Sequence, residues 1–218
     1  YIWRDVSRWF DTFKPQVVAG FGGWFCVPAL LEAKRRGIPV LTHEQNVSLG
    51  KANRFLALFA DRLALSFEAT RAKSALRRCV VTGLPIRRLL DNVPRQEALA
   101  HLGCEPNRFT VLVLGGSQGA SAINNFVCRM LPLIREDERA FWQFVHLTGL
   151  RDSNLVSEAY RKIGVRALVK SHLTDMALAY SVADMVISRA GASTLAELAR
   201  CALPALLIPY PYAGSHQL

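Results

Sequence analysis

Six small residues at positions 115–120, Gly-Gly-Ser-Gln-Gly-Ala, follow an apolar run from Phe109 to Leu114. Apolar residues at helical spacing come next, so the pattern is that of a strand, a glycine loop and a helix. Such a loop leaves backbone N–H groups without partners at a helix N-terminus, where they can bind a phosphate or diphosphate. No Gly-Lys-Ser/Thr follows, so Mg-ATP hydrolysis has no support, and the spacing departs from G-x-G-x-x-G. The loop predicts nucleotide binding, with a tight structural turn as the alternative.

A second pattern of strand, small-residue turn and helix occupies positions 188–197. Its backbone amides and hydroxyls could bind a diphosphate, and the Glu197 carboxylate could accept hydrogen bonds from ribose hydroxyls. Thr194 and Glu197 are three residues apart, which is also the spacing of a capping box, where Thr194 would accept from the Glu197 amide. The sequence leaves both interpretations open.

Other polar residues give weaker signals. His43 to Asn46 end a strand-like run, where polar side chains reach a ligand or simply begin a loop. His146 lies inside the apolar run from Trp142 to Leu147 and is expected to be a hydrogen-bonded core histidine. The chain contains no Asp-x-Asp pair and no His/Cys cluster with metal-ligand spacing, so no bound metal is predicted.

The composition favours a globular protein with an anionic partner. The 218 residues are 51% hydrophobic, and 27 Lys and Arg against 17 Asp and Glu give a net charge of +10. Five scattered cysteines without a C-x-x-C pair are expected to be reduced and structural. The apolar stretch from Cys201 to Gly214 is too short and too rich in proline to span a membrane. Because the chain starts at Tyr1 without methionine and stops at Leu218 after an apolar run, we expect an internal fragment of a longer protein.

Strand-like runs alternate with helical patterns along the chain, which predicts an α/β fold with parallel sheets covered on both faces. The expected strands are 17–19, 38–41, 62–67, 80–81, 109–114, 143–147, 165–169, 185–188 and 205–208. The alternation lapses after Gly83-Leu84-Pro85, so the predicted organisation is a first domain over 1–82, a linker over 83–94 and a second domain over 95–218. Ligands of such sheets bind beyond the carboxyl ends of the strands, which predicts a cleft between facing loops.

The opening segment carries Ile2, Val6, Trp9, Phe10 and Phe13 at helical spacing, with basic residues nearby. An ordinary core-facing helix is the first interpretation. Docking of the helix at a membrane interface is the alternative.

Several motifs taken together resemble one family. They are Gly20-Phe21-Gly22-Gly23 with Pro28, His43-Glu44-Gln45-Asn46, Gly83-x-Pro85-x-Arg87, the glycine loop 115–120, Asp175-Met176, Arg189-x-Gly191-Ala192-x-Thr194 and Glu197. In order and spacing they resemble the MurG family, the N-acetylglucosaminyltransferases that use undecaprenyl-pyrophosphoryl-muramoyl-pentapeptide in bacterial peptidoglycan synthesis. The resemblance implies a GT-B fold of two Rossmann-like domains, here both truncated, and inverting transfer from UDP-N-acetylglucosamine without cofactor or essential metal.

The resemblance also implies roles for individual residues. Ser117 and the stretch Ala192, Ser193, Thr194, Leu195, Ala196 and Glu197 would hold the diphosphate and ribose, with Glu197 on the ribose hydroxyls. Leu173 would meet the uracil through its backbone, Arg87 would face the nucleotide, and Asn46 and Gln217 would contact the donor sugar. The family's histidine near the acceptor hydroxyl belongs to a glycine loop expected before Tyr1, so no catalytic base is assigned, and the isolated fragment is expected to be inactive.

Family members act on a polyprenyl-linked acceptor, which implies a peripheral position at the cytoplasmic face of the bacterial membrane and an anionic lipid surface as partner. Two alternatives stay open: another GT-B lipid glycosyltransferase, such as one acting on diacylglycerol, and a nucleotide-binding module without catalysis. Nucleic-acid binding is ranked last because aromatic residues are not interleaved with basic ones.

Overall fold

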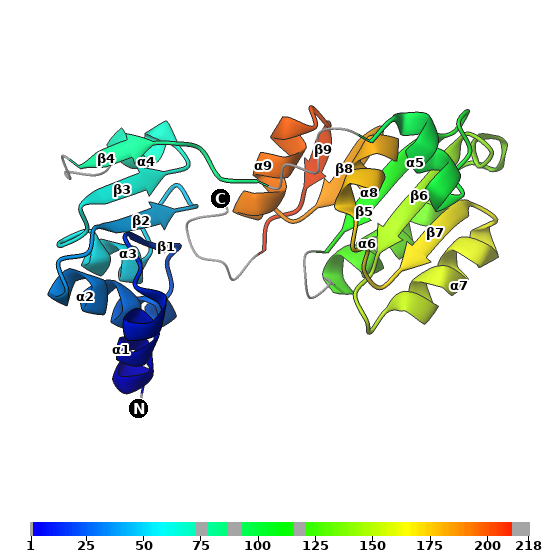
Figure 1. Cartoon of the computed structure of the whole chain (residues 1–218). Helices are drawn as coiled ribbons and strands as arrows, with labels where there is room; N and C mark the ends of the chain where they lie inside the picture. The colour runs from blue at the N-terminus through cyan, green and yellow to red at the C-terminus, as the bar shows by residue number, and fades with distance from the viewer. Residues whose placement is uncertain (1, 73–77, 87–92, 116–120, 211–218) are drawn as a thin grey trace. The chain divides into compact units, whose positions relative to one another are not determined.

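The structure is a computed structural model that describes residues 2–72, 78–86, 93–115 and 121–210. The chain divides into two compact units, Tyr1–Pro85 and Ile86–Leu218. Each unit is a parallel sheet with helices, shown in Figure 1. The α/β organisation expected from the alternating pattern is therefore present in both.

Unit 1 contains a four-stranded sheet in the order β1-β2-β3-β4, with every pair parallel. Its elements are α1 (Ile2–Phe13), β1 (Val18–Gly20), the 3₁₀ helix η1 (Trp24–Cys26), α2 (Val27–Arg35), β2 (Val40–Glu44), α3 (Lys51–Leu56), β3 (Arg62–Leu65), α4 (Glu68–Ala72) and β4 (Cys79–Val81). Pro28 lies in the first turn of α2, where a missing N–H costs nothing, and Gly37 follows the helix with φ 71°. The predicted strands of this unit are confirmed, with ends that differ from the prediction by at most three residues.

Packing in unit 1 leaves no room for a side chain at Gly20, the last residue of β1. A Cβ there would lie 2.8 Å from Leu30 Cδ2 on α2. Leu30 belongs to a buried cluster with Val6 and Phe10 of α1. Glycine at this position therefore lets α2 pack directly onto the strand.

A polar network ties α1 to α2. Glu32 is buried and accepts hydrogen bonds from Arg35 and Arg36, and Arg36 also donates to Asp11 of α1 at 2.6 Å. These hydrogen bonds, that from Arg35 first, lower the pKa of Glu32 to about 2. Glu32 therefore stays ionised at neutral pH, and Arg36 links it to Asp11, which holds the first helix in place.

Unit 2 contains a five-stranded parallel sheet in the order β7-β6-β5-β8-β9. Its elements are α5 (Arg95–Leu102), β5 (Phe109–Leu114), α6 (Ser121–Met130), the 3₁₀ helices η3 (Leu131–Leu133) and η4 (Glu136–Glu138), β6 (Trp142–Leu147), α7 (Ser153–Ile163), β7 (Arg166–Lys170), α8 (Met176–Val182), β8 (Met185–Ser188), α9 (Ala192–Arg200) and β9 (Ala205–Leu207). The five strands predicted for this part of the chain are confirmed, and two of them, 109–114 and 185–188, have the predicted bounds.

Alternate residues of the central strand β5 belong to two separate hydrophobic cores. Leu112 and Leu114 pack with α5 and α8, whereas Val111 and Val113 pack with α6 and α7. A strand buried on both faces needs apolar residues at consecutive positions, and all residues from Phe109 to Leu114 are apolar except Thr110, whose hydroxyl accepts from Gln143 Nε2. The helices on either side of this sheet are visible in Figure 1.

The expected linker, 83–94, spans the division between the two units. On the first side, His43 Nε2 hydrogen-bonds the Gly83 carbonyl at 3.0 Å, and Gly83 has φ 72°. On the second side, Ile86 and Val93 pack against the core of unit 2. The domain bounds 1–82 and 95–218 stay predictions.

Candidate functional site

The sheet of unit 2 has a switch point between β5 and β8. The chain runs outward from β5 to β6 and β7, then returns to the other side of β5 as β8. Loops that follow β5 and β8 therefore diverge at their carboxyl ends, which is where open α/β sheets bind ligands. The turn before α9 that the sequence singled out follows β8, and the glycine loop 115–120 follows β5 in the sequence, where residues 116–120 lie outside the described ranges.

The turn after β8 exposes a helix N-terminus. Gly191 is the N-cap of α9 with φ −75° and ψ 141°, and it makes no side-chain capping hydrogen bond. The first intrahelical bond runs from Leu195 N to Gly191 O at 2.9 Å, so the N–H groups of Ala192, Ser193 and Thr194 precede it. Backbone donors and the helix dipole at this end suit an anion.

The capping-box interpretation of Thr194 and Glu197 is wrong. Thr194 lies in the first turn of α9 rather than at its N-cap, because the helix already begins at Ala192. The small residues Ala190, Gly191 and Ala192 let the chain turn from strand to helix three residues earlier than that interpretation requires. Glu197 then lies one turn into the helix, on the same side as Ser193 and Thr194, because residues three and four apart share a helix face.

Glu197 has a partner that the sequence analysis missed. Tyr180 of α8 donates its hydroxyl to Glu197 Oε2 at 2.7 Å. Burial first, then this hydrogen bond, raise the pKa of Tyr180 well above its ordinary value, so the hydroxyl remains a proton donor. Glu197 itself is half-buried. A tyrosine 17 residues upstream on another helix gives no local sequence signal.

Leu173 lies in the loop between β7 and α8, at the same carboxyl edge of the sheet. Its side chain packs against the core that contains Tyr180 and Leu178, while the neighbouring His172 and Thr174 are exposed. The loop ends at Asp175, whose carboxylate accepts from Ala177 N at 3.1 Å and caps α8. With its side chain held in the core, Leu173 can offer only backbone groups to a ligand.

A buried network supports the start of α6. His146, fully buried in β6, contacts Tyr160 Oη through Nδ1 at 3.1 Å and Asn124 Oδ1 through Nε2 at 3.0 Å. Asn124 in turn donates to Asp152 Oδ2 at 2.7 Å. A hydrogen bond from the Ser121 side chain, then that from Asn124, lower the pKa of Asp152.

His146 is therefore the hydrogen-bonded core histidine that the sequence predicted. Burial lowers its pKa to about 4, so the imidazole is neutral. Because Asn124 uses its Nδ2 on Thr148 O and Asp152, its Oδ1 must accept from His146 Nε2–H, and Nδ1 accepts from Tyr160. The network anchors Ser121, the first residue of α6.

In unit 1, Asn46 follows β2 and is held by a buried carboxylate. Glu44 Oε1 accepts from Asn46 N at 3.0 Å and from Asn46 Nδ2 at 3.1 Å, and Thr70 Oγ1 donates to Asn46 O at 3.2 Å. Glu44 Oε2 accepts from Gly50 N and from Asn53 Nδ2, both at 2.8 Å. From the sequence, the motif from His43 to Asn46 was only a weak signal. The hydrogen bonds of Glu44, which hold the loop after β2, were not predicted.

Three predicted site residues, Arg87, Ser117 and Gln217, lie outside the described residues. The seven residues Leu173 and 192–197 lie in loops or helix starts at the carboxyl edge of the unit 2 sheet. Asn46 belongs to unit 1.

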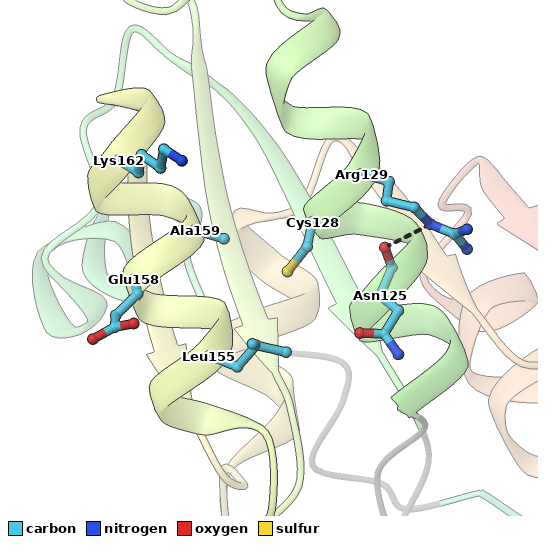
Figure 2. A pocket seen from close by; sticks show the side chains of 7 residues that line it. All are labelled: Asn125, Cys128, Arg129, Leu155, Glu158, Ala159 and Lys162. Carbon is cyan, nitrogen blue, oxygen red and sulfur yellow. Dashed lines mark hydrogen bonds between the residues drawn. The ribbon is translucent and has the colours of Figure 1, made fainter.

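Two cavities lined by described residues are separate from these site residues. One of about 580 Å³ lies between α6 and α7, where Cys128 points between the helices, as Figure 2 shows; its lining residues are Asn125, Cys128, Arg129, Leu155, Glu158, Ala159 and Lys162. The other, about 530 Å³, is an apolar groove beside α1 in unit 1, bordered by Trp9, Phe13 and Val17 among others. Neither is lined by a predicted site residue.

Within the described ranges, no group of three or more His, Cys, Asp or Glu side chains could hold a metal ion. The five cysteines are free of disulfides. None of the helices in the described part of the chain has the length and hydropathy needed to cross a bilayer.

Comparison with known proteins adds an independent observation. Residues 2–65 match the Glycosyltransferase family 28 N-terminal domain, and residues 110–218 match the Glycosyltransferase family 28 C-terminal domain. A UDP-N-acetylglucosamine--N-acetylmuramyl-(pentapeptide) pyrophosphoryl-undecaprenol N-acetylglucosamine transferase from Desulforamulus reducens is 40% identical over 227 residues, covering 99% of this chain and 59% of the relative. A protein of the same name from Pelobacter propionicus is 38% identical, covering 99% of this chain and 61% of the relative.

Solved structures agree with this. A crystal structure of MurG from Acinetobacter baumannii is similar with a TM-score of 0.73 and 30% identity, covering 99% of this chain and 59% of that one. A UDP complex of S. aureus MnaA shares the fold, with a TM-score of 0.65 and 14% identity over 94% of this chain and 61% of that one. The predicted fold class, α/β of GT-B type with Rossmann-like domains, is confirmed.

The chain spans about three fifths of the length of these relatives. Both domain descriptions match in chain order, the first within unit 1 and the second within unit 2. The chain therefore belongs to glycosyltransferase family 28, and its resemblance to the MurG family is confirmed.

Proposed function

We propose that this chain belongs to an inverting glycosyltransferase that moves N-acetylglucosamine from UDP-N-acetylglucosamine to undecaprenyl-pyrophosphoryl-muramoyl-pentapeptide, a step of peptidoglycan synthesis. The names of relatives at about 40% identity support the substrates. The observation that carries the proposal is the N-terminus of α9 at the switch point of the unit 2 sheet, with a carboxylate one turn along the same helix face.

Unit 2 is proposed to bind the nucleotide. The N–H groups of Ala192, Ser193 and Thr194 would donate to the diphosphate, with Ser117 of the glycine loop, and the Glu197 carboxylate would accept from ribose hydroxyls. Leu195 and Ala196 complete the helix turn that separates the N–H groups of residues 192–194 from the Glu197 carboxylate. The backbone at Leu173 would meet the uracil, since its side chain is committed to the core.

In the transfer step the leaving UDP gains negative charge. Donors that already point at that position stabilise the charge without reorganising, and a helix N-terminus supplies several at once. Arg87 is proposed to add a positive charge there. Asn46 and Gln217 are proposed as contacts of the donor sugar. No residue of this chain is assigned as the base that takes the proton of the acceptor hydroxyl.

The lipid acceptor is proposed to bring the enzyme to an anionic membrane surface at the cytoplasmic face, through α1. This helix buries Val6 and Phe10 but exposes Trp9 and Phe13, which are 69% and 83% accessible. Arg4, Arg8 and Lys14 are also exposed on this segment. Exposed aromatic and basic side chains on one short helix suit an interfacial position in anionic lipid.

Calorimetry of the full protein with UDP tests the nucleotide assignment. Glu197→Ala should weaken UDP binding about tenfold, because ribose hydroxyls lose a charged acceptor. Glu158→Ala, the same change at an exposed position on α7, is the control and should leave UDP affinity unchanged. Equal affinity of the wild type and Glu197→Ala for UDP would contradict the assignment.

The acceptor is tested separately by supplying the full protein with UDP-N-acetylglucosamine and either the muramoyl-pentapeptide lipid or diacylglycerol. Transfer to the first supports the proposal, and transfer to diacylglycerol alone would replace it. UDP binding with no transfer to either lipid would indicate a nucleotide-binding module without catalysis.

A further inference from the structure

We infer that Tyr180 is a positioning residue for nucleotide binding: its hydroxyl holds the Glu197 carboxylate in the orientation in which it accepts from ribose. The inference rests on the proposed function, which gives Glu197 that role. Its physical basis is the 2.7 Å hydrogen bond from Tyr180 Oη to Glu197 Oε2.

The position of the Tyr180 hydroxyl is set by the core. Tyr180 is 3% accessible and packs in the same buried cluster as Ala98, Leu99 and Leu198. Its helix, α8, is fixed at the start by the Asp175 cap. The phenol ring is therefore fixed, and the hydrogen bond forms only in the rotamer of Glu197 that brings its carboxylate to the Tyr180 hydroxyl.

Glu197, in contrast, has a long side chain that is half-buried and would otherwise sample several rotamers. A carboxylate has about four acceptor sites, and Tyr180 uses one of them on Oε2. The remaining sites, including those of Oε1, are available to ligand hydroxyls. Because the rotamer is selected before the ligand arrives, binding does not have to order this side chain.

The test compares wild type and Tyr180→Phe in the full protein by calorimetry with UDP, 2′-deoxy-UDP and 3′-deoxy-UDP. Phenylalanine keeps the buried ring and removes only the hydrogen bond. UDP affinity should fall about three- to tenfold. The loss should shrink to less than about twofold for the deoxy analogue that lacks a hydroxyl bound by Glu197, because the carboxylate then has no ligand partner to lose.

The matched control is Tyr160→Phe. Tyr160 is also buried in unit 2, and its hydroxyl also has one buried polar partner, His146 Nδ1 at 3.1 Å. This variant should lower thermal stability, and any change in affinity should be equal for UDP and both deoxy analogues, because Tyr160 bonds His146 and not Glu197. It separates the loss of any buried tyrosine hydrogen bond from the loss of the bond to Glu197.

A double-mutant cycle tests whether Tyr180 acts through Glu197. In a Glu197→Ala background, Tyr180→Phe should have no further effect on UDP affinity, since the group it positions is absent. Additive losses would overturn the inference, as would equal losses for UDP and both deoxy analogues, or unchanged UDP affinity of Tyr180→Phe. Failure of the wild type to bind UDP would instead overturn the proposed function, so the two failures are distinguishable.

Discussion

Glu44 Oε1 accepts two hydrogen bonds from Asn46, one from the backbone N–H at 3.0 Å and one from side-chain Nδ2 at 3.1 Å. A carboxylate can only accept, so the amide group that faces it must be the NH₂ end of Asn46. The amide carbonyl Oδ1 is then directed away from Glu44. If Asn46 contacts the donor sugar as proposed, it does so chiefly as an acceptor, from a hydroxyl or an acetamido N–H.

Glu44→Gln should lower the free energy of unfolding by about 1–3 kcal/mol. Glutamine offers one acceptor oxygen and one NH₂ group where four donors, from Asn46, Gly50 and Asn53, now find a carboxylate. Urea unfolding measures the change. Glu68→Gln, at an exposed position, should change stability by less than about 0.5 kcal/mol. Equal stability of Glu44→Gln and wild type would show that the loop does not depend on this network.

The neutral His146 makes stability depend on pH. Its folded-state pKa of about 4 lies below the ordinary 6.5, so between these values the unfolded chain binds a proton that the folded chain refuses. The free energy of unfolding therefore falls as pH drops through this window, by about 2 kcal/mol at pH 5 relative to pH 7.5 from this group alone.

Urea unfolding at pH 7.5 and pH 5 measures this effect as the difference between wild type and His146→Gln, which does not titrate. His172→Gln, at an exposed histidine of the same unit, is the control and should keep the pH dependence of wild type. A pH dependence of His146→Gln identical to that of wild type would contradict the assignment.

The exposed aromatic residues of α1 predict lipid binding that depends on them. Trp9→Asp with Phe13→Asp should reduce co-sedimentation with vesicles of anionic phospholipid about tenfold or more, because two interfacial anchors are lost. Leu133→Asp, at an exposed apolar residue of unit 2, is the control and should bind as wild type. Binding of the α1 variant equal to that of wild type would remove α1 as the contact.

Arg189 joins the segments that follow β8 and β9. Its Nη1 donates to Pro209 O at 3.0 Å and Ile208 O at 3.3 Å, and its guanidinium lies 5.5 Å from the Tyr210 ring centroid. Arg189→Lys keeps the charge but loses the planar fork, so amide hydrogen exchange over 205–210 should rise by about fivefold, close to 1 kcal/mol. The control is Arg161→Lys, in an exposed ion pair, which should leave hydrogen exchange over 205–210 unchanged. An unaltered exchange rate in Arg189→Lys would show that Arg189 does not stabilise this segment.

The three central strands of unit 2, β5, β6 and β8, were predictable from sequence because they are buried on both faces. The runs 109–114 and 185–188 are apolar except for Thr110 and Ser188, and the structure reproduces their bounds. His146 as a core residue was predictable for the same reason. The order of strands in the sheet was not, since a parallel strand carries no local mark of its neighbour.

The role of Glu197 shows where sequence reasoning fails at the site. The spacing from Thr194 fits a capping box, and only the start of α9 at Ala192 excludes it. The partners Tyr180 and Glu44 were missed because each acts through a contact that tertiary packing creates. The side chain of Glu44 is buried at the end of β2, whereas a polar residue at that position predicts an exposed loop.

The N–H groups in the first turn of α9 have no side-chain cap at Gly191. An anion bound to those N–H groups would bind the native state but not the unfolded chain, so a nucleotide bound there as proposed would stabilise the fold, by about 2.7 kcal/mol at a hundred times its dissociation constant. Resistance to heat and proteolysis would then rise and fall with the cellular supply of the sugar nucleotide.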